Sequence, residues 1–292
     1  QAHSTDDLGS RNVAVGTEAL SDMNFATATD SYNVAVGDQA GKRITTGVQN
    51  TIVGGLAGDA MTTGVNNTFI GFQAATVGVV TGSANVAIGA AAGAELTSGV
   101  DNVFIGTDSG PAVTSGGNNL LLGHDAGRTG SPGGNQTTGS DSIALGDENI
   151  GNAYIQVDWT VSSDERDKTD FADLNLGLDF VKALEPVTYY WDKRSKYGDK
   201  DADDYDLDNL TPDGTHKEDW MDVGFKAQSV QALEEAAGYK LSDKKNLTVS
   251  SVEDGKQLGL QYSKFVPILV KAIQEQDAII QSLTARITAL ES

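Results

Sequence analysis

The chain has 292 residues, a net charge of −21 at pH 7, three histidines and no cysteine. This length corresponds to about two domains, and the acidic charge argues against binding of nucleic acid or of anionic membranes. The missing cysteines exclude disulfides, thiolate zinc sites and cysteine nucleophiles, no apolar run is long enough to insert into a membrane, and we expect neither a cofactor nor a metal site.

Residues 9 to about 150 contain a repeat built on the pattern Asn-x-x-x-Gly. Between the second and seventh copies the asparagines follow one another every 17 or 18 residues, and an eighth copy has serine instead. A glycine three residues before the anchor, missing only from the Asn33 copy, keeps the same register, and so does a small residue three residues after the anchor glycine in the first seven copies. Such self-similarity at a fixed period predicts a stack of short structural units. The anchors are Asn12, Asn33, Asn50, Asn67, Asn85, Asn102, Asn119 and Ser142.

The three residues between each anchor and its glycine are mostly apolar and β-branched, as in Val-Phe-Ile at 103–105. Segments this short predict strands rather than helices. The third residue is always Val, Ile or Leu, so we expect the face that carries the first and third residues to be the buried one. The middle residue is apolar in every copy, so we expect the opposite face to be covered as well, with a neighbouring chain as one candidate.

A 17-residue unit cannot bury its own apolar face, so the repeats must stack. We therefore predict that residues 1–150 form an all-β repeat, a β-solenoid or β-roll of a trimeric fibre, closed within one chain or between three. The recurring asparagine is expected to be structural, because it tolerates turn conformations. The polar loops between strands, such as 43–49, are expected to face a receptor. The acidic residues of the array are interpreted as scattered, without a carboxylate pair for glycan hydrolysis.

The period stops after Ile150, and residues 151–163 form a junction in which 155–159 is predicted to be one strand. The junction ends in a serine that is followed five residues later by a lysine. A serine hydroxyl becomes a good nucleophile when a base takes its proton, and a lysine can do so once its amine is neutral. The pattern predicts a self-cleavage site, whose residues are Ser163, Asp164, Glu165, Arg166, Asp167 and Lys168.

Three further segments follow the junction in the region 164–292, for which we predict an α+β domain with helices at 178–184 and 227–237. They are Leu178 to Trp191, Gly224 to Val230, and Tyr262 to Glu275. With the junction motif, they resemble the C-terminal intramolecular chaperone, or auto-processing peptidase, domain of phage tail fibres, tailspikes and endosialidases. Lys226 and Ser229 depart from that family's pattern. The N-terminal repeats resemble the heads of trimeric adhesins and the shafts of phage tail fibres.

The resemblance implies a homotrimer whose C-terminal domain nucleates assembly of the fibre and then cuts the chain once, between Ser163 and Asp164. By motif position Ser163 is the nucleophile and Lys168 the base, with Glu165 and Arg166 as supporting residues. The neighbouring carboxylates oppose a neutral lysine, so the folded trimer would have to bury it. Attack of the serine on its own carbonyl would close a four-membered ring. Attack on the preceding carbonyl and attack from a neighbouring chain both avoid this strain.

The chain is predicted to end in a helix over 265–292 with a heptad seam, which indicates self-association through a coiled coil. Its isoleucine and leucine placement alone favours two strands, whereas the resemblance implies three, and we follow the resemblance. The seam consists of Leu269, Ile273, Gln276, Ile280, Leu283, Ile287 and Leu290. The acidic stretch from Asp199 to Asp208 lacks the glycine and glutamate of an EF-hand loop, and is predicted to be a solvated insertion.

The leading interpretation is the distal part of a phage tail fibre that attaches to a host surface, with its chaperone domain acting in the host cytoplasm during assembly. The expected partners are two further copies, a host receptor of glycan or outer-membrane type, and other virion tail proteins bound through a missing N-terminal part, since the chain starts at Gln1. A glycan-degrading tailspike fragment and a bacterial trimeric adhesin are the alternatives. Nothing in the sequence indicates turnover on an external substrate.

Overall fold

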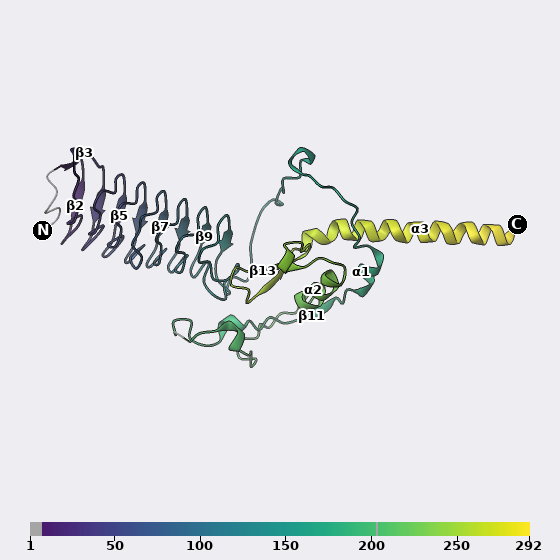
Figure 1. The fold of residues 1–292 in the computed structure, drawn as a ribbon. Coiled ribbons are helices and arrows are strands. Elements are labelled where there is room, and N and C mark those ends of the chain that lie inside the picture. Colours follow the sequence, from purple (N-terminus) through teal and green to yellow (C-terminus); the bar gives the residue numbers. More distant parts are fainter. Residues whose placement is uncertain (1–7, 203) are drawn as a thin grey trace. The chain divides into compact units, whose positions relative to one another are not determined.

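The computed structural model describes residues 8–202 and 204–292, and Figure 1 shows the order of the elements. The chain divides into two compact units. The first contains the chain up to Gly151 together with the later segments Lys193–Asp213 and Val252–Gln257, and the second contains Asn152–Asp192, Gly214–Ser251 and Leu258–Ser292. Over the described part of the chain, no helix has the length and apolar character to cross a membrane.

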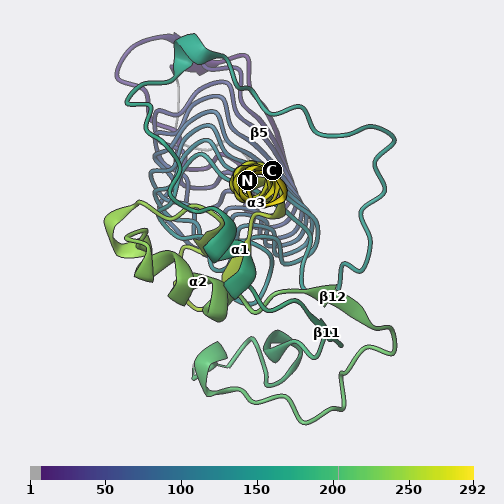
Figure 2. The ribbon, with the colours of Figure 1, turned by 90° about the vertical axis from the view of Figure 1, so that its right-hand side faces the viewer.

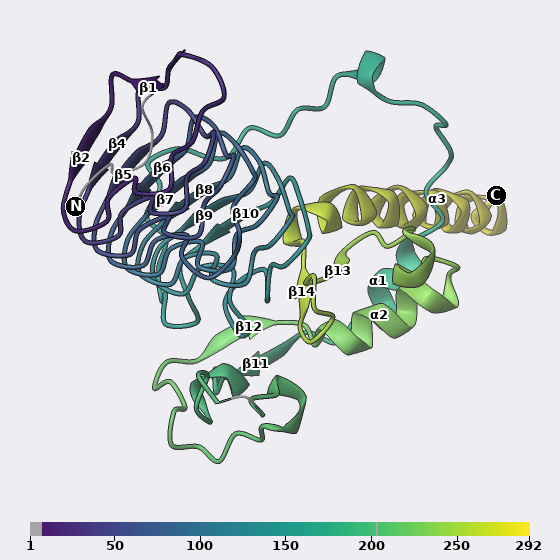
Figure 3. The same cartoon turned by 60° about the vertical axis from the view of Figure 1, so that its left-hand side comes forward.

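The first unit is a β-solenoid, as predicted. Eight strands form one parallel sheet in which the strands of successive repeats lie side by side (Figure 3). Each strand pairs in register with the next, so that Val13 lies opposite Val34 and Phe69 opposite Ala87. A short parallel pair of β1 and β3 flanks the first repeat. The strands are β1 (Gly9–Ser10), β2 (Val13–Val15), β3 (Thr29–Asp30), β4 (Val34–Val36), β5 (Thr51–Val53), β6 (Thr68–Ile70), β7 (Val86–Ile88), β8 (Val103–Ile105), β9 (Leu120–Leu122) and β10 (Ile143–Leu145).

The solenoid core uses the middle residue of each strand, so the prediction that the first and third residues are buried was wrong. Phe69, Phe104 and Leu121 are completely buried, whereas Ile105 is 41% exposed. Each narrow coil closes within one chain and admits one inward side chain from each three-residue strand. The constant Val, Ile or Leu at the third position therefore reflects β-propensity and an apolar outer face rather than the core.

The recurring asparagines form a buried hydrogen-bonded ladder, which confirms their structural role. The Oδ1 atom of Asn67 accepts the backbone N–H of Asn85 at 3.0 Å, and the Nδ2 atom of Asn85 donates to the Gly99 carbonyl at 2.8 Å. The glycine that ends each strand is equally constrained. Gly54 has a φ of +139°, and a Cβ there would lie 2.3 Å from the carbonyl oxygen of Gly71. Only glycine fits this close approach of successive coils.

The two later segments of the first unit pack on the last coils of the solenoid. Lys200 pairs with the buried Glu148, Arg128 pairs with Asp201, and Leu207 is fully buried. The segment 193–213 contains the predicted acidic insertion and the short helices η2 (Arg194–Lys196) and η3 (Leu207–Asn209). The insertion is a loop, as predicted, but it is only partly solvated.

The second unit is a small α+β region, again as predicted. Its core consists of Leu176, Phe180, Val230, Val249, Phe265 and Ile268. Helix α1 packs against α3, as the view along α3 in Figure 2 shows. The elements are η1 (Glu165–Asp167), α1 (Leu178–Ala183), β11 (Val187–Tyr189), β12 (Asp222–Gly224), α2 (Ala227–Ala236), η4 (Leu241–Asp243), β13 (Val249–Ser251), β14 (Leu258–Leu260), η5 (Tyr262–Lys264) and α3 (Phe265–Glu291), with β11–β12 and β13–β14 as antiparallel pairs.

The predicted strand at 155–159 does not form, so this prediction was wrong. Every residue from 151 to 173 is exposed, including Trp159 at 71%. A strand is stable only when its backbone groups pair with a neighbour, and no described strand pairs with this stretch. The junction is instead an extended, solvent-exposed segment.

Candidate functional site

A single 3-10 turn brings Lys168 back to Ser163. Helix η1 reverses the chain, and the backbone N–H of Lys168 closes the turn on the Glu165 carbonyl at 3.1 Å. The Lys168 ammonium then lies 2.6 Å from the Ser163 hydroxyl oxygen and 3.0 Å from the Ser163 carbonyl oxygen. The structure thus brings together the two residues that the sequence predicts to act as a pair, and the lysine also contacts the carbonyl of the Ser163–Asp164 peptide bond.

Asp164 and Arg166 hold the turn in this shape. The Asp164 carboxylate accepts the backbone N–H of Arg166 at 2.9 Å, and it accepts two guanidinium hydrogen bonds at 3.0 and 2.7 Å. The side-chain hydrogen bond from Arg166 is the main reason why the pKa of Asp164 lies below its ordinary value. Arg166 is therefore occupied by Asp164, and Glu165 contributes its backbone carbonyl to the turn.

The site is open to water in the single chain. Both Ser163 and Lys168 are exposed, and neither belongs to the core of the second unit. A lysine takes a proton only in its neutral form, and removal from water favours that form. The geometry for a serine–lysine pair is present, whereas the dry surroundings that such a pair requires are not supplied by one chain.

The predicted trimerisation residues lie along α3 and are exposed. Ile273 is 64%, Ile280 53% and Ile287 55% exposed, and Gln276 is exposed in the same seam. The first turns of the helix instead contribute Phe265 and Ile268 to the core. Helix α3 is thus anchored at its start, and an apolar seam remains uncovered along the rest of its length.

A carboxylate in the body of α3 contacts the N-terminus of α1. Glu275 of α3 accepts the backbone N–H of Leu178 at 2.7 Å, at the N-terminus of α1, where a negative charge is favourable. A Cβ at Gly177 would lie 2.2 Å from the same carboxylate oxygen. The glycine before α1 therefore makes room for this contact.

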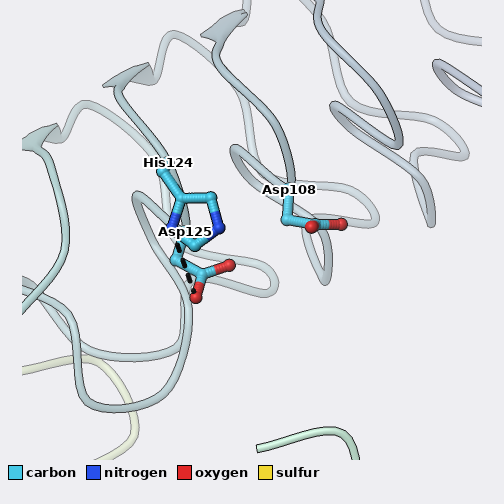
Figure 4. A group of neighbouring side chains, drawn as sticks. All are labelled: Asp108, His124 and Asp125. Atoms are coloured by element: carbon cyan, nitrogen blue, oxygen red, sulfur yellow. Dashed lines mark ion pairs between the residues drawn. The ribbon is translucent and has the colours of Figure 1, made fainter. Parts of the chain in front are cut away.

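The solenoid carries a group of metal-ligand type that the sequence interpretation missed. Asp108, His124 and Asp125 each offer one ligand atom, and these atoms lie within 4.8 Å of one another (Figure 4). Asp108 and Asp125 occupy the same repeat position 17 residues apart, which corrects the interpretation that the acidic residues are out of register. That shared position was the sequence signal that could have revealed the group.

Cations of the protein already neutralise part of this group. Arg128 lies 3.3 Å from the Asp125 carboxylate, and Lys200 lies 3.7 Å from it. Burial, followed by the charge of Asp125, raises the pKa of Asp108 above its ordinary value. Among the described residues this is the arrangement that could hold a metal ion, and Asp108 is the carboxylate of the group for which no described side chain forms an ion pair.

The structure combines a β-solenoid with a mixed α+β region that ends in an exposed helix. Residues 163–239 match the family model described as chaperone of endosialidase, so the match begins at Ser163 itself. The chain thus carries a chaperone domain similar to that family, and with its solenoid it fits a protein of the tail-fibre and endosialidase-chaperone type. No curated protein and no solved structure matches it.

The match supports a role of this domain in trimer folding and in auto-processing. It is also consistent with self-association, which the seam of α3 predicts. The sequence resemblance to this family is therefore confirmed.

Proposed function

We propose that this chain is the distal part of a homotrimeric phage tail fibre, and that its chaperone domain assembles the trimer and then cuts the chain between Ser163 and Asp164. The contact of the Lys168 ammonium with both the Ser163 hydroxyl and the Ser163 carbonyl carries the proposal. The start of the family match at Ser163 supports it independently.

The cut is a hydrolysis. The bond between the carbonyl carbon of Ser163 and the nitrogen of Asp164 breaks, and one water molecule supplies the hydroxyl of the new carboxyl group and the proton of the new amine. The serine hydroxyl is activated when Lys168 takes its proton. A hydrogen-bond donor on the carbonyl oxygen stabilises the negative charge that develops there. The strain of a four-membered ring directs the serine away from its own carbonyl and towards the Ser163 carbonyl of a neighbouring copy. The serine oxygen forms an ester with that carbon while the Asp164 nitrogen leaves with a proton, and water then hydrolyses the ester. Attack on the preceding carbonyl would instead break the bond between Ser162 and Ser163.

In this proposal, trimer assembly supplies the water-free surroundings of Ser163 and Lys168 that the single chain lacks. The exposed junction and the exposed seam of α3 belong to the same unit, so association of three copies is the step that can bury the serine–lysine pair. Burial disfavours the charged ammonium and yields the neutral base. In this proposal, cleavage therefore occurs only after three chains have assembled.

Attachment is assigned to the solenoid. Its coils form a rigid, hydrogen-bonded scaffold, and polar loops such as 43–49 connect the strands. Loops held by a rigid scaffold are the usual recognition surface. In this proposal the loops bind a glycan or an outer-membrane component of the host, the fibre is part of the virion, the chaperone acts in the host cytoplasm, and further tail proteins bind through a preceding part of the fibre.

Denaturing mass spectrometry of freshly expressed protein tests the cut. Wild type is expected to give fragments 1–163 and 164–292, whose summed mass exceeds that of the intact chain by one water. Ser163→Ala and Lys168→Ala should remain intact, and Lys168→Arg should too, because it keeps the charge but cannot act as the base. Ser162→Ala is the matched control and should be cut. An intact wild-type trimer would refute the proposal.

Mixed trimers separate the two routes of attack. Ser163→Ala and Lys168→Ala chains are co-expressed with different tags. Cleavage of the Ser163→Ala chain in the mixture would show that a neighbouring copy supplies the serine. Cleavage of neither chain would show that the serine and the lysine must belong to the same copy. Attack on the preceding carbonyl would be recognised in wild type by a cut before Ser163 instead of after it.

A further inference from the structure

The coils of the solenoid are joined by a threonine ladder that runs in one direction. The backbone N–H and the hydroxyl of Thr97 both donate to the Thr114 carbonyl at 2.9 Å. Thr114 in turn donates to the Thr137 carbonyl, at 2.8 Å from its N–H and 3.3 Å from its hydroxyl. At these two positions each threonine therefore places its N–H and its hydroxyl against the carbonyl of the next coil. The last coil, which contains Thr137, has no following coil to accept its donors.

Glu253 takes the place of that missing carbonyl. One carboxylate oxygen, Oε1, accepts the N–H of Thr137 at 3.2 Å and the Thr137 hydroxyl at 3.0 Å. The same oxygen accepts the N–H groups of Thr138 at 3.0 Å and Gly139 at 2.9 Å. Thr97 and Thr114 direct the same two donors, the N–H and the hydroxyl, at the carbonyl of the following coil. The glutamate therefore accepts the donors that a following coil would otherwise accept.

Further contacts fasten the same end of the solenoid. Asp254 accepts the N–H of Asn135 at 3.1 Å. From the segment 193–213, Lys193 donates to the Glu148 carbonyl at 2.8 Å, and Lys200 pairs with the Glu148 carboxylate at 2.5 Å. The Glu148 side chain is almost completely buried. A buried carboxylate needs a cation beside it, and here the cation comes from a part of the chain that follows the cleavage site.

We propose that the segments 193–213 and 252–257 form a cap that recognises the open end of the solenoid, and that this cap keeps the C-terminal product, residues 164–292, bound after the chain is cut. The binding partner is the fragment 1–163 of the same protein. The cap supplies acceptors to backbone donors that would otherwise be unpaired, and it supplies a cation to a buried carboxylate. The cut as such belongs to the proposed function, whereas the recognition of the solenoid end does not depend on it.

The cap has a second effect. A solenoid end with free backbone donors is a template for pairing with another chain, and repeat proteins stay soluble when their terminal units are capped. A retained product keeps the end of the finished fibre closed.

The test makes the cut independently of Ser163. In a Ser163→Ala background, a recognition sequence for a site-specific protease is inserted after Thr160, within the exposed junction. After complete cleavage, size-exclusion chromatography over a dilution series measures whether the two fragments co-elute, and a binding assay gives their dissociation constant. We expect co-elution. Separation of the fragments at all concentrations would overturn the proposal.

Glu253→Ala then tests the recognition itself. Loss of a charged acceptor with four donors should weaken the complex at least about tenfold, and Glu253→Gln should weaken it less because it keeps an acceptor oxygen. Glu185→Ala is the matched control, since Glu185 is exposed in the same fragment and its side chain forms no hydrogen bond or ion pair with the described residues. An unchanged dissociation constant for a folded Glu253→Ala protein would overturn the proposal.

The two proposals fail in different ways. An intact wild type with retained fragments in the protease-cut protein would refute self-cleavage and leave the cap standing. A self-cleaving wild type whose protease-cut fragments separate would do the reverse.

Discussion

The two units differ in how completely they bury their apolar side chains. The solenoid completes its core within one chain, where Phe69, Phe104 and Leu121 are fully buried and the asparagine and threonine ladders pair the backbone. The second unit has a smaller core and leaves the apolar seam of α3 in water. The solenoid is held together from coil to coil by its own hydrogen bonds. The second unit leaves an apolar seam exposed, which is consistent with the self-association that the chaperone family implies.

Among the predictions, a charge in the apolar seam of α3 should have the largest effect, a loss of the trimer. Ile280→Asp places a charge in the predicted coiled coil, where burial without a partner is costly, and we expect loss of the trimer and of any cut that depends on it. Analytical ultracentrifugation measures the oligomeric state, and circular dichroism should show that the monomer retains its solenoid. Gln281→Asp, on the same helix but outside the seam, serves as the control. A trimeric Ile280→Asp protein would show that the seam does not hold the copies together.

Within the solenoid, inward and outward side chains of the strands should differ in their contribution to stability. Phe104→Ala should lower the free energy of unfolding by about 3–5 kcal/mol, because it leaves a cavity in a packed core. Ile105→Ala changes the neighbouring outward residue, which is 41% exposed, and should cost less. Chemical denaturation followed by circular dichroism gives both values. A larger loss from Ile105→Ala would indicate that the outer face is buried by another copy.

Substitution of a ladder asparagine should cause the next largest loss of stability. Asn85→Ala removes the acceptor of the Asn102 N–H and the donor to the Gly99 carbonyl. Each buried group left unpaired costs about 1–3 kcal/mol. Asn24→Ala, at an exposed position outside the ladder, should change stability little. Thermal unfolding of both variants tests this prediction, and equal effects would contradict a structural ladder.

The smallest expected effect is a pH dependence of the cap. Burial raises the pKa of the Glu253 carboxyl, but hydrogen bonds from the amides of Thr138 and Gly139 and from Thr137 outweigh it, so the pKa lies below its ordinary value. A carboxyl with a lowered pKa stabilises the folded state above its unfolded pKa of about 4.3. That contribution is lost as the pH falls through the folded value.

The fragment complex should accordingly weaken below about pH 4. Other carboxylates titrate in the same range, so the informative quantity is the difference between wild type and Glu253→Gln, measured as the dissociation constant between pH 7 and pH 3. A wild type whose pH dependence equals that of Glu253→Gln would exclude a role of the ionised carboxylate.

The sequence predicted the parts of the structure that are repeated or local. The anchors gave the register of the parallel sheet, and the short spacing between Ser163 and Lys168 gave a turn that brings them together. The buried face of the strands could not be read from β-branched residues, because Val and Ile suit an outer sheet face as well as a core. The predicted strand at 155–159 failed because alternating apolar residues do not supply a pairing partner.

The contacts between segments far apart in the chain could not be predicted from the sequence patterns. Glu253 stands outside the repeat, and nothing in its surroundings indicates that it accepts the donors of Thr137. The ion pair of Lys200 with Glu148 likewise joins segments whose composition indicates only loops. Such contacts depend on how the chain returns to its own solenoid, which no local period encodes.

The contact between Thr137 and Glu253 can form only after a delay during synthesis of the chain. Thr137 and Glu253 lie 116 residues apart in the chain, whereas successive rungs of the threonine ladder such as Thr97 and Thr114 lie 17 apart. At about 5–20 residues per second, every coil has left the ribosome on the order of ten seconds before the glutamate that closes the last one. During that interval the donors of Thr137 at the end of the solenoid have no acceptor from Glu253.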